Sequence, residues 1–301
     1  MTGAAGYVGR FVVAELLAQG WEVRAWARDG TDRGGFPGPV AWVEGGLERP
    51  ESADPLVEGA DALVHAAYRH LPGRYRGGEG QDLEGYLAAN LTGSLALLRR
   101  AHAAGVGRVV FLSSRAVYGR RLPGRPLDED HPAWPDSHYG AYKAAVEAFI
   151  AAWAATTGWA ACALRPTGVY GLTRPVERSK WLDLVAAVLA ERPWPVVRAG
   201  TEVHGEDVAR AVRLLLTAPA AEVAGRAFNC SDLTVSTRDV AAIVQDLTGA
   251  RGPLPDPPAT LPAKVMETAR LRALGLRFGG RPLLERTVAE LVAAARTLAS
   301  G

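Results

Sequence analysis

Tyr139 and Lys143 are the two side chains whose types and spacing most directly suggest chemistry. They are four residues apart, so on a helix both lie on one face, within reach of a common ligand. A free tyrosine titrates near pH ~10, and a nearby ammonium lowers that pKa by favouring the phenolate. The pair could therefore exchange a hydroxyl proton near neutral pH. The same spacing also occurs on ordinary helix surfaces, so the rest of the chain must decide between these interpretations.

A glycine-rich segment, Thr2 to Gly9 (TGAAGYVG), opens the chain and leads into an apolar helical pattern that ends at Gly20. Glycines at this spacing permit a tight turn and let the backbone approach a pyrophosphate at the helix N-terminus. Such a motif should follow a buried strand of about five residues, yet Met1 alone precedes Thr2. Loss of this central strand would expose two neighbouring edges, so we expect a mis-assigned start or a truncated N-terminus.

The next predicted strand decides which dinucleotide the chain prefers. It ends at Ala27, where an acidic residue would accept hydrogen bonds from an NAD ribose. Arg28 follows and could hold a 2′-phosphate, so we predict NADP(H) as the preferred cofactor. Asp29 keeps NAD(H) possible if the strand register differs by two residues, and an exposed arginine at a strand end is the plain alternative.

Strand and helix patterns alternate through the first 170 residues, which predicts an α/β fold with a Rossmann-like, doubly wound parallel sheet. The strand at 108–113 delivers Ser114 to the carboxyl edge of the sheet, where ligands of such folds collect. After Gly171 the regularity weakens. The predicted strands are 23–27, 40–43, 62–67, 108–113, 161–164 and 227–230, and the predicted helices are 50–59, 86–104, 138–157, 181–191, 206–217, 236–248 and 283–298.

Composition excludes several classes of function. The formal net charge is +2 over 301 residues, so neither a nucleic acid nor a membrane surface has electrostatic support as a partner. There is no apolar run of ~18 residues that could span a membrane. Cys162 and Cys230 lie in apolar, strand-like runs and indicate buried thiols in a reducing cytoplasm, and no cluster has metal-ligand spacing.

Several motifs occur in one order and together resemble the extended short-chain dehydrogenase/reductase family, the group that contains NAD-dependent epimerases and dehydratases. The resemblance covers essentially the whole chain after Met1. Its matching pieces are 2–9, Val64 to Ala67 (VHAA), Asn90 to Gly93 (NLTG), Ser113 to Gly119 (SSRAVYG), Tyr139 to Lys143 (YGAYK), Leu164 to Gly171 (LRPTGVYG) and Val203 to Val208 (VHGEDV).

The resemblance implies a catalytic triad of Ser114, Tyr139 and Lys143, supported by Asn90 through a backbone kink and a water. Ser114 would hydrogen-bond the substrate oxygen, and Tyr139 would exchange the proton while a hydride passes to or from the nicotinamide. The residues implied to bind the cofactor are Gly3, Gly6, Tyr7, Val8, Gly9, Arg28, Leu47, Ala66, Ala67, Tyr139, Lys143, Pro166 and Val169. Those implied to bind the substrate are Ser114, Tyr68, Arg174 and Arg178. Residues 1–172 plus about 201–231 would form the NAD(P)-binding domain, and about 173–200 and 232–301 a small substrate-binding region.

Departures from the family pattern narrow the range of possible substrates. Dehydratases of the family place Asp-Glu after the catalytic hydroxyl, where Arg115 and Ala116 stand here. Nucleotide-sugar enzymes usually carry an arginine in the place of 200–202, which reads Gly-Thr-Glu. Gly46 stands where many members have an aspartate near the adenine, so Leu47 and the backbone would serve there.

These departures favour a small polar alcohol or carbonyl compound. Arg174, Arg178 and Lys180 could clamp a carboxylate, as in an enzyme resembling uronate dehydrogenases, or they could form an exposed basic loop. The segment 69–80 could cover a substrate or be a solvated loop. A sugar epimerase and a non-catalytic dinucleotide sensor are the alternatives to an oxidoreductase.

The helix 138–157 is apolar almost all round after Lys143. Such a helix must be buried on more than one side. We expect it to pair with the helix 86–104 and their symmetry mates in a two-fold homodimer.

Overall fold

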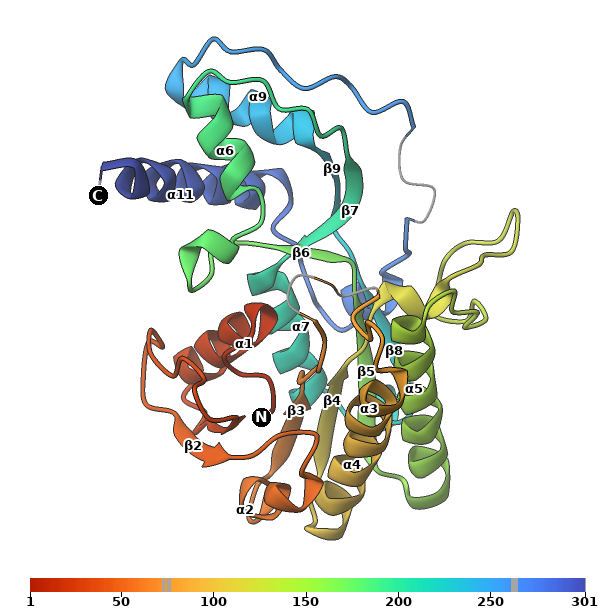
Figure 1. Ribbon diagram of the computed structural model, residues 1–301. Coiled ribbons are helices and arrows are strands. Elements are labelled where there is room, and N and C mark those ends of the chain that lie inside the picture. The colour runs from red at the N-terminus through yellow and green to blue at the C-terminus, as the bar shows by residue number, and fades with distance from the viewer. Residues whose placement is uncertain (72–73, 75–76, 261–264, 301) are drawn as a thin grey trace. The chain divides into compact units, whose positions relative to one another are not determined.

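The structure is a computed structural model that describes residues 1–71, 74, 77–260 and 265–300 of the chain. The chain divides into two compact units (Figure 1). The first contains Met1–Pro166, Val208–Cys230 and Met266–Leu276, and the second contains Thr167–Asp207, Ser231–Val265 and Arg277–Gly301. The expected domain boundaries differ from these units, since residues 167–172 and 201–207 belong to the second unit and 266–276 to the first. The predicted loops at 69–80 and 253–262 lie partly outside the described residues.

The described strands of the first unit all run parallel. One ladder pairs β1 with β2, and another has the order β3-β4-β5-β8. Thr2 joins the two ladders through single parallel bridges to Trp26 and His65. This confirms the predicted parallel, doubly wound sheet. The strands are β1 Arg24–Ala27, β2 Ala41–Glu44, β3 Ala62–His65, β4 Arg108–Leu112, β5 Ala160–Pro166 and β8 Ala227–Cys230.

Met1 and Thr2 fill only part of the space between β1 and β3, next to the carboxyl ends of these strands. The Thr2 amide donates to Val64 O at 2.9 Å, and Met1 O accepts from the Trp26 amide at 2.9 Å. Below them a cleft separates the two strands and is lined by apolar side chains that include Leu16, Leu56 and Leu216. Among the described residues, no strand pairs with the amino-terminal halves of β1 and β3 on the sides that face this cleft. The central position of the sheet is therefore almost unfilled.

Helices cover this sheet. The hydrophobic core between α4, α5 and the strands contains Leu97, Phe111, Val146 and Ile150, all nearly inaccessible to solvent. The helical segments of this unit are α1 Tyr7–Ala18, η1 Pro50–Ala53, α2 Asp54–Val57, α3 Leu83–Leu87, η2 Ala88–Gly93, α4 Ser94–Ala103, η3 Arg115–Tyr118, α5 His138–Thr157, α8 Ala220–Val223, α10 Ala269–Ala273 and most of α7 Gly205–Thr217.

The helix α5 has the bounds that the sequence predicts, because both ends carry capping signals. Ser137 is its N-cap and accepts a hydrogen bond from the Gly140 amide at 3.2 Å. Gly158 ends it in the left-handed conformation with φ 72°, which suits glycine. Gly140 is also required sterically, since a Cβ there would lie 2.3 Å from Ala116 O. The start of α5 is thereby packed against η3, the segment that Ser114 begins.

The second unit contains a small mixed sheet that the sequence did not predict. In it β7 pairs in parallel with β6 and antiparallel with β9. Its core joins Tyr170, Leu184, Val240 and Leu291. The elements of this unit are β6 Gly168–Tyr170, η4 Val176–Arg178, α6 Leu182–Leu189, β7 Ala199–His204, β9 Leu233–Ser236, α9 Thr237–Thr248 and α11 Gly280–Ser300.

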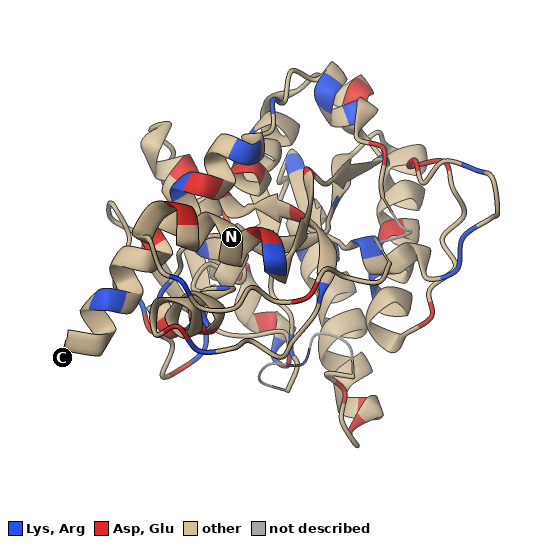
Figure 2. Cartoon of the chain, turned by 90° about the horizontal axis from the view of Figure 1, so that it is seen from above, with Lys and Arg blue, Asp and Glu red and all other residues tan. Residues whose placement is uncertain are grey.

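Figure 2 shows basic and acidic residues interspersed along the ribbon, in keeping with the net charge of +2. Among the described helices, none has the length and apolar character needed to cross a membrane. In the same part of the chain, His, Cys, Asp and Glu side chains nowhere gather in a group of three or more suited to a metal ion.

Candidate active site

The glycine segment forms a tight turn between Thr2 and α1. Gly3 has φ 69°, and a Cβ on it would lie 2.6 Å from the backbone of Ala66. A Cβ on Gly9 would lie 2.0 Å from Gly3 O. Gly6 is the N-cap of α1 and offers no side-chain cap, so the first turn of the helix points its amide groups toward this turn. A cradle that only glycine can line, at the positive end of a helix, suits the pyrophosphate of a dinucleotide.

A chain of buried hydrogen bonds connects this turn to the helical segment η2. Thr2 Oγ1 lies 2.8 Å from His65 Nδ1, and His65 Nε2 lies 2.8 Å from Ser94 Oγ. Because Ser94 Oγ donates to Asn90 O at 2.5 Å, it must accept from His65 Nε2, which fixes the tautomer. Burial lowers the pKa of His65 to about 3, so the imidazole is neutral at physiological pH. The neutral ring ties the glycine turn to η2.

Asn90 lies in η2, a π-helical interruption between α3 and α4. This is the backbone kink expected from the family resemblance. Its side-chain oxygen accepts from the Arg69 amide at 2.8 Å, and its Nδ2 donates to Arg69 O at 2.8 Å and Tyr86 O at 3.0 Å. Asn90 therefore fixes the backbone that follows β3, the strand next to the glycine turn, and with it the neighbouring Tyr68.

Ser114 follows β4 and is the N-cap of η3. Its Oγ accepts a hydrogen bond from the Ala116 amide at 3.1 Å. This bond uses an oxygen lone pair and leaves the hydroxyl proton available to donate. A serine held in this way can polarise a substrate carbonyl without changing its own conformation.

Lys143 is 3% exposed, and its ammonium donates to Leu112 O at the end of β4. Its Nζ lies 4.4 Å from the centre of the Phe111 ring and 5.9 Å from that of Tyr139. Burial lowers the pKa of Lys143 from 10.5 to about 7, although the Glu147 carboxylate opposes this shift. The ammonium is therefore close to its midpoint of titration at neutral pH.

A cluster of tyrosines surrounds this pair. The Tyr68 ring lies 5.0 Å from Tyr139 and 5.6 Å from Tyr142, and its hydroxyl is 3.2 Å from that of Tyr86. Burial raises the pKa of Tyr68 and Tyr142, and raises that of Tyr86 to about 12. These three phenols stay protonated near neutral pH, and Tyr68 forms a wall beside Tyr139.

The structure thus brings together Tyr139, Lys143, Tyr68 and Asn90, next to η3 with Ser114. Arg28 is exposed just past the end of β1, and its side chain runs along Gly46. Leu47 is 4% exposed and packs into the core, with its carbonyl against Gly93. Asp29 accepts from the Gly30 amide at 2.8 Å within its own turn.

The remaining predicted residues lie past the end of β5 or close to it. Pro166 ends that strand, and Val169 is in β6 of the second unit. Arg174 and Arg178 are exposed residues of the second unit. Lys180, considered with them as a carboxylate clamp, instead forms an ion pair of 2.5 Å with the buried Glu202.

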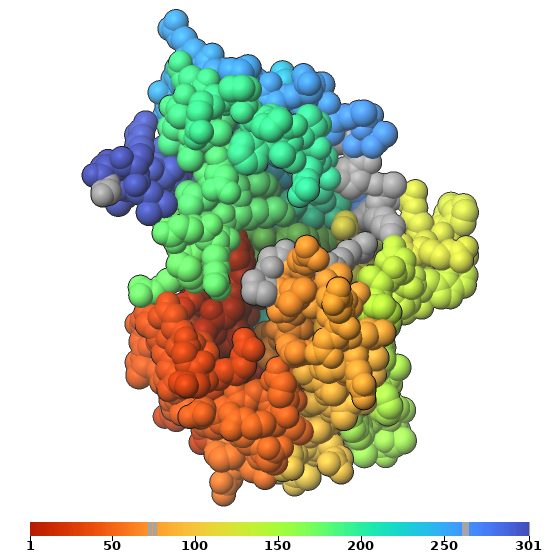
Figure 3. All heavy atoms as spheres, viewed as in Figure 1, coloured from red at the N-terminus to blue at the C-terminus, as the bar shows by residue number. Residues whose placement is uncertain are grey.

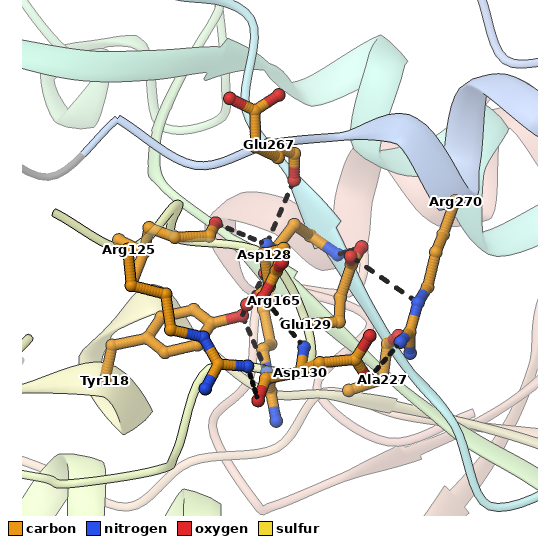
Figure 4. Close-up of polar contacts among 11 residues, drawn as sticks. Tyr118, Arg125, Asp128, Glu129, Asp130, Arg165, Ala227, Glu267 and Arg270 are labelled. Carbon is orange, nitrogen blue, oxygen red and sulfur yellow. Dashed lines mark hydrogen bonds and ion pairs between the residues drawn. The ribbon is translucent and has the colours of Figure 1, made fainter. Parts of the chain in front are cut away.

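Sequence reasoning missed a buried polar network beneath this site. Arg165 in β5 contacts Glu147 of α5 and donates to the Tyr118 hydroxyl at 2.7 Å. Figure 4 shows Arg165 next to Tyr118 and the segment of Asp128 and Glu129, with Arg270 paired to this segment. In the sequence, the residue that could have indicated this network is Glu147. It is the main charged residue in an apolar helix and lies one turn after Lys143.

A parallel doubly wound sheet, a glycine cradle at the start of α1 and a Ser-Tyr-Lys set at the carboxyl edge define a dinucleotide-binding α/β protein. Comparison with known proteins agrees with this class. The model of the NAD dependent epimerase/dehydratase family matches residues 1–231. The chain belongs to this family of NAD-dependent enzymes, which confirms the resemblance seen in the sequence.

Individual relatives include UDP-glucose 4-epimerases. The protein from Streptomyces lividans is 32% identical over 218 residues, 69% of this chain and 63% of that protein. The protein from Corynebacterium glutamicum is 33% identical over 172 residues, 57% of this chain and 51% of that protein. The matches thus span about half to two thirds of these relatives. The NAD complex of UDP-glucose 4-epimerase from Thermus thermophilus has a TM-score of 0.78 at 26% identity, covering 97% of this chain and 98% of that one.

Proposed function

We propose that this chain is an NAD(P)-dependent oxidoreductase that transfers a hydride at an alcohol or carbonyl group of a small polar substrate. The observation that carries the proposal is the placement of Tyr139 one turn before a buried lysine ammonium, beside the segment begun by Ser114. A phenol next to an ammonium and a hydroxyl donor is suited to exchanging a substrate proton.

The residues present fit a dinucleotide, because Gly3 and Gly9 allow a tight turn at the N-terminus of α1 in which any Cβ would clash with backbone. The bound nicotinamide would supply the hydride acceptor or donor. Ser114 would hold the substrate oxygen through its free hydroxyl proton, and Tyr139 would take or give the proton at that oxygen. Lys143 would favour the phenolate through its charge and hold the nicotinamide ribose. Tyr68 would exclude water on one side of the reacting oxygen.

Cofactor choice follows from the end of β1. Ala27 supplies no carboxylate for a ribose, and Arg28 is exposed beside Gly46. Asp29 is occupied in a local turn. We therefore propose NADP(H) as the preferred cofactor and NAD(H) as the second choice, within a family that is NAD-dependent as a whole.

The second unit favours a substrate without a diphosphate. Gly200 has no side chain, and a Cβ there would lie 2.8 Å from the Glu202 carboxylate. Glu202 is 6% exposed and carries a negative charge already matched by Lys180. These positions therefore offer a diphosphate no arginine to bind it. Arg174 and Arg178 remain candidates for binding a carboxylate, as on a sugar acid.

A second candidate function is epimerisation of a nucleotide sugar, which the relatives named as UDP-glucose 4-epimerases favour. The oxidoreductase and the epimerase differ in their effect on free cofactor. Only the oxidoreductase gives a net oxidation or reduction of it. Incubation with sugars, sugar acids and aldehydes should change nicotinamide absorbance stoichiometrically if the chain is an oxidoreductase. Conversion of UDP-glucose without net cofactor reduction would support the epimerase instead. Binding of dinucleotide without any turnover would indicate a sensor.

We also propose a two-fold homodimer. The outer face of α5 is apolar, with Phe149 48% exposed and Ala141, Ala148 and Ala152 also exposed. In Figure 3 the gold and yellow-green surfaces of α4 and α5 lie side by side in the first unit. Pairing these helices with their symmetry mates would cover that face. A cytoplasmic location remains a prediction from the two buried cysteines.

A further inference from the structure

Glu147 and Arg165 form an ion pair that lies almost entirely inside the first unit. Their side chains are 9% and 8% exposed. Arg165 Nε lies 3.0 Å and 3.1 Å from the two carboxylate oxygens, and Arg165 Nη2 lies 2.5 Å from Oε2. Ser113 Oγ donates to the other oxygen, Oε1. Both charges are thus fully bonded, which is the condition for a buried pair to be tolerated.

Buried pairs seldom stabilise a fold more than apolar residues of the same volume would. On α5 the pair is flanked by Val146 and Ile150, which are both inaccessible to solvent. Apolar residues at positions 147 and 165 together would extend that core without a buried charge. Fold stability alone therefore does not explain why a carboxylate occupies this place.

The position of the pair relative to the site supplies an explanation. Lys143 donates to Leu112 O, and Glu147 accepts from Ser113 Oγ, so successive turns of α5 bind successive residues at the end of β4. The next residue of that segment is Ser114, and the preceding turn of α5 carries Tyr139. These two contacts fix both the rotation of α5 and its position along the strand.

We propose that Glu147 is a positioning residue of the site. Its hydrogen bonds to Arg165 and Ser113 fix α5 against the end of β4. They also place a negative charge one helical turn after Lys143. Its catalytic consequence rests on the proposed function, but the geometry does not. Arg165 extends this hydrogen-bond network, because it also donates to the Tyr118 hydroxyl. That hydroxyl in turn donates toward Asn229 Oδ1 at 2.7 Å.

The other groups near Lys143 cannot replace this charge. His65 is neutral, and Tyr68 and Tyr142 keep their protons because burial raises their pKa. Of the carboxylates in the part of the chain that the structure describes, Glu147 is the one whose charge acts on Lys143. The charged and titratable groups that face or act on the ammonium are His65, Tyr68, Tyr139, Tyr142 and Glu147, and Arg165 is paired to Glu147.

The chain allows a direct test without any substrate, because its only lysines are at 143, 180 and 264. Protein labelled with ¹³C at the lysine ε-carbon gives one signal per lysine, assigned by single replacements at 180 and 264. In Glu147→Gln the pKa of Lys143 should fall by about one unit or more, since an opposite charge is lost and the Arg165 charge is left unbalanced. In Glu147→Gln with Arg165→Met the pKa of Lys143 should lie between the values of the single variant and the wild type, because the unbalanced Arg165 charge is removed as well.

Glu202→Gln is the control, since it removes the buried carboxylate partner of another lysine, the partly exposed Lys180. It should move the Lys180 signal and leave Lys143 unchanged. The double variant removes both members of the ion pair, so no arginine charge is left without its carboxylate, and it should fold even if Glu147→Gln does not. A Lys143 titration that is the same in the wild type and in folded Glu147→Gln would overturn the proposal. If Glu147→Gln does not fold, a double variant whose Lys143 titration equals that of the wild type would overturn it as well.

Turnover then separates this proposal from the proposed function. With any substrate that reacts, Glu147→Gln should lower kcat more than it raises KM, and Glu147→Asp should recover part of the loss. The pH at which activity changes should move together with the Lys143 titration. A shifted Lys143 signal in a protein that turns over no substrate would support the positioning role while contradicting the oxidoreductase.

Discussion

Replacement of Lys143 by methionine should make the stability of the first unit depend less on pH than it does in the wild type. Lys143 is buried, and its pKa is lowered from 10.5 to about 7 by desolvation. Between these values the folded protein holds fewer protons than the unfolded chain, so wild-type stability rises with pH across this window. Below pH ~7 both states carry the charge, and the wild type retains the whole cost of burying an ammonium.

Each pKa unit corresponds to ~1.36 kcal/mol, so the wild type should gain about 2–3 kcal/mol relative to Lys143→Met between pH ~6 and ~9. Methionine keeps a similar shape and cannot titrate, and groups that do not interact with Lys143 cancel in the comparison. We expect Lys143→Met to be the more stable protein at pH ~6, with the difference shrinking as the pH rises. The assay is urea denaturation of both proteins without cofactor at several pH values. A difference in unfolding free energy that stays constant with pH would refute a desolvated ammonium at this position.

Three further predictions concern the cofactor and the assembly. Arg28→Asp should weaken NADPH binding far more than NADH binding, by ~1.5–3 kcal/mol or roughly tenfold and more, as calorimetry can measure; equal losses would contradict a 2′-phosphate contact. Gly9→Ala should abolish dinucleotide binding in a folded protein, because its Cβ would lie 2.0 Å from Gly3 O; unchanged affinity by fluorescence titration would exclude the cradle. Phe149→Glu should convert a dimer into monomers by light scattering, and a wild type that is already monomeric at micromolar concentration would contradict the apolar face of α5 as an interface.

The part of the site that sequence patterns could predict is the part controlled by local signals. The helix α5 was predicted with its observed bounds because Ser137 and Gly158 cap a long apolar run. Ser114 was predicted at a strand end because β4 is a short, continuous apolar run. Both features depend on neighbours in the sequence.

The unpredicted features depend on pairing between distant residues. The mixed sheet of the second unit joins β7 to β9 across Ala199 and Ser236, and its short strands have no clear alternation. The ion pair between Lys180 and Glu202 was not predicted, because the two residues are 22 positions apart in the sequence. Lys180 was therefore considered as part of a substrate clamp. Arg165 and Glu147 come from a strand and a helix, and only the fold places them together.

The most direct test of the proposed chemistry is the turnover of Tyr139→Phe. This change removes the phenolic oxygen and its proton and leaves the ring, which packs against Tyr68 and Tyr142, nearly unchanged. If Tyr139 exchanges the substrate proton, turnover should fall by ~10²–10⁴-fold while cofactor affinity changes little. Lys143→Met should reduce both. Near-wild-type turnover of Tyr139→Phe, with hydride transfer shown to be rate-limiting by an isotope effect, would contradict the central claim.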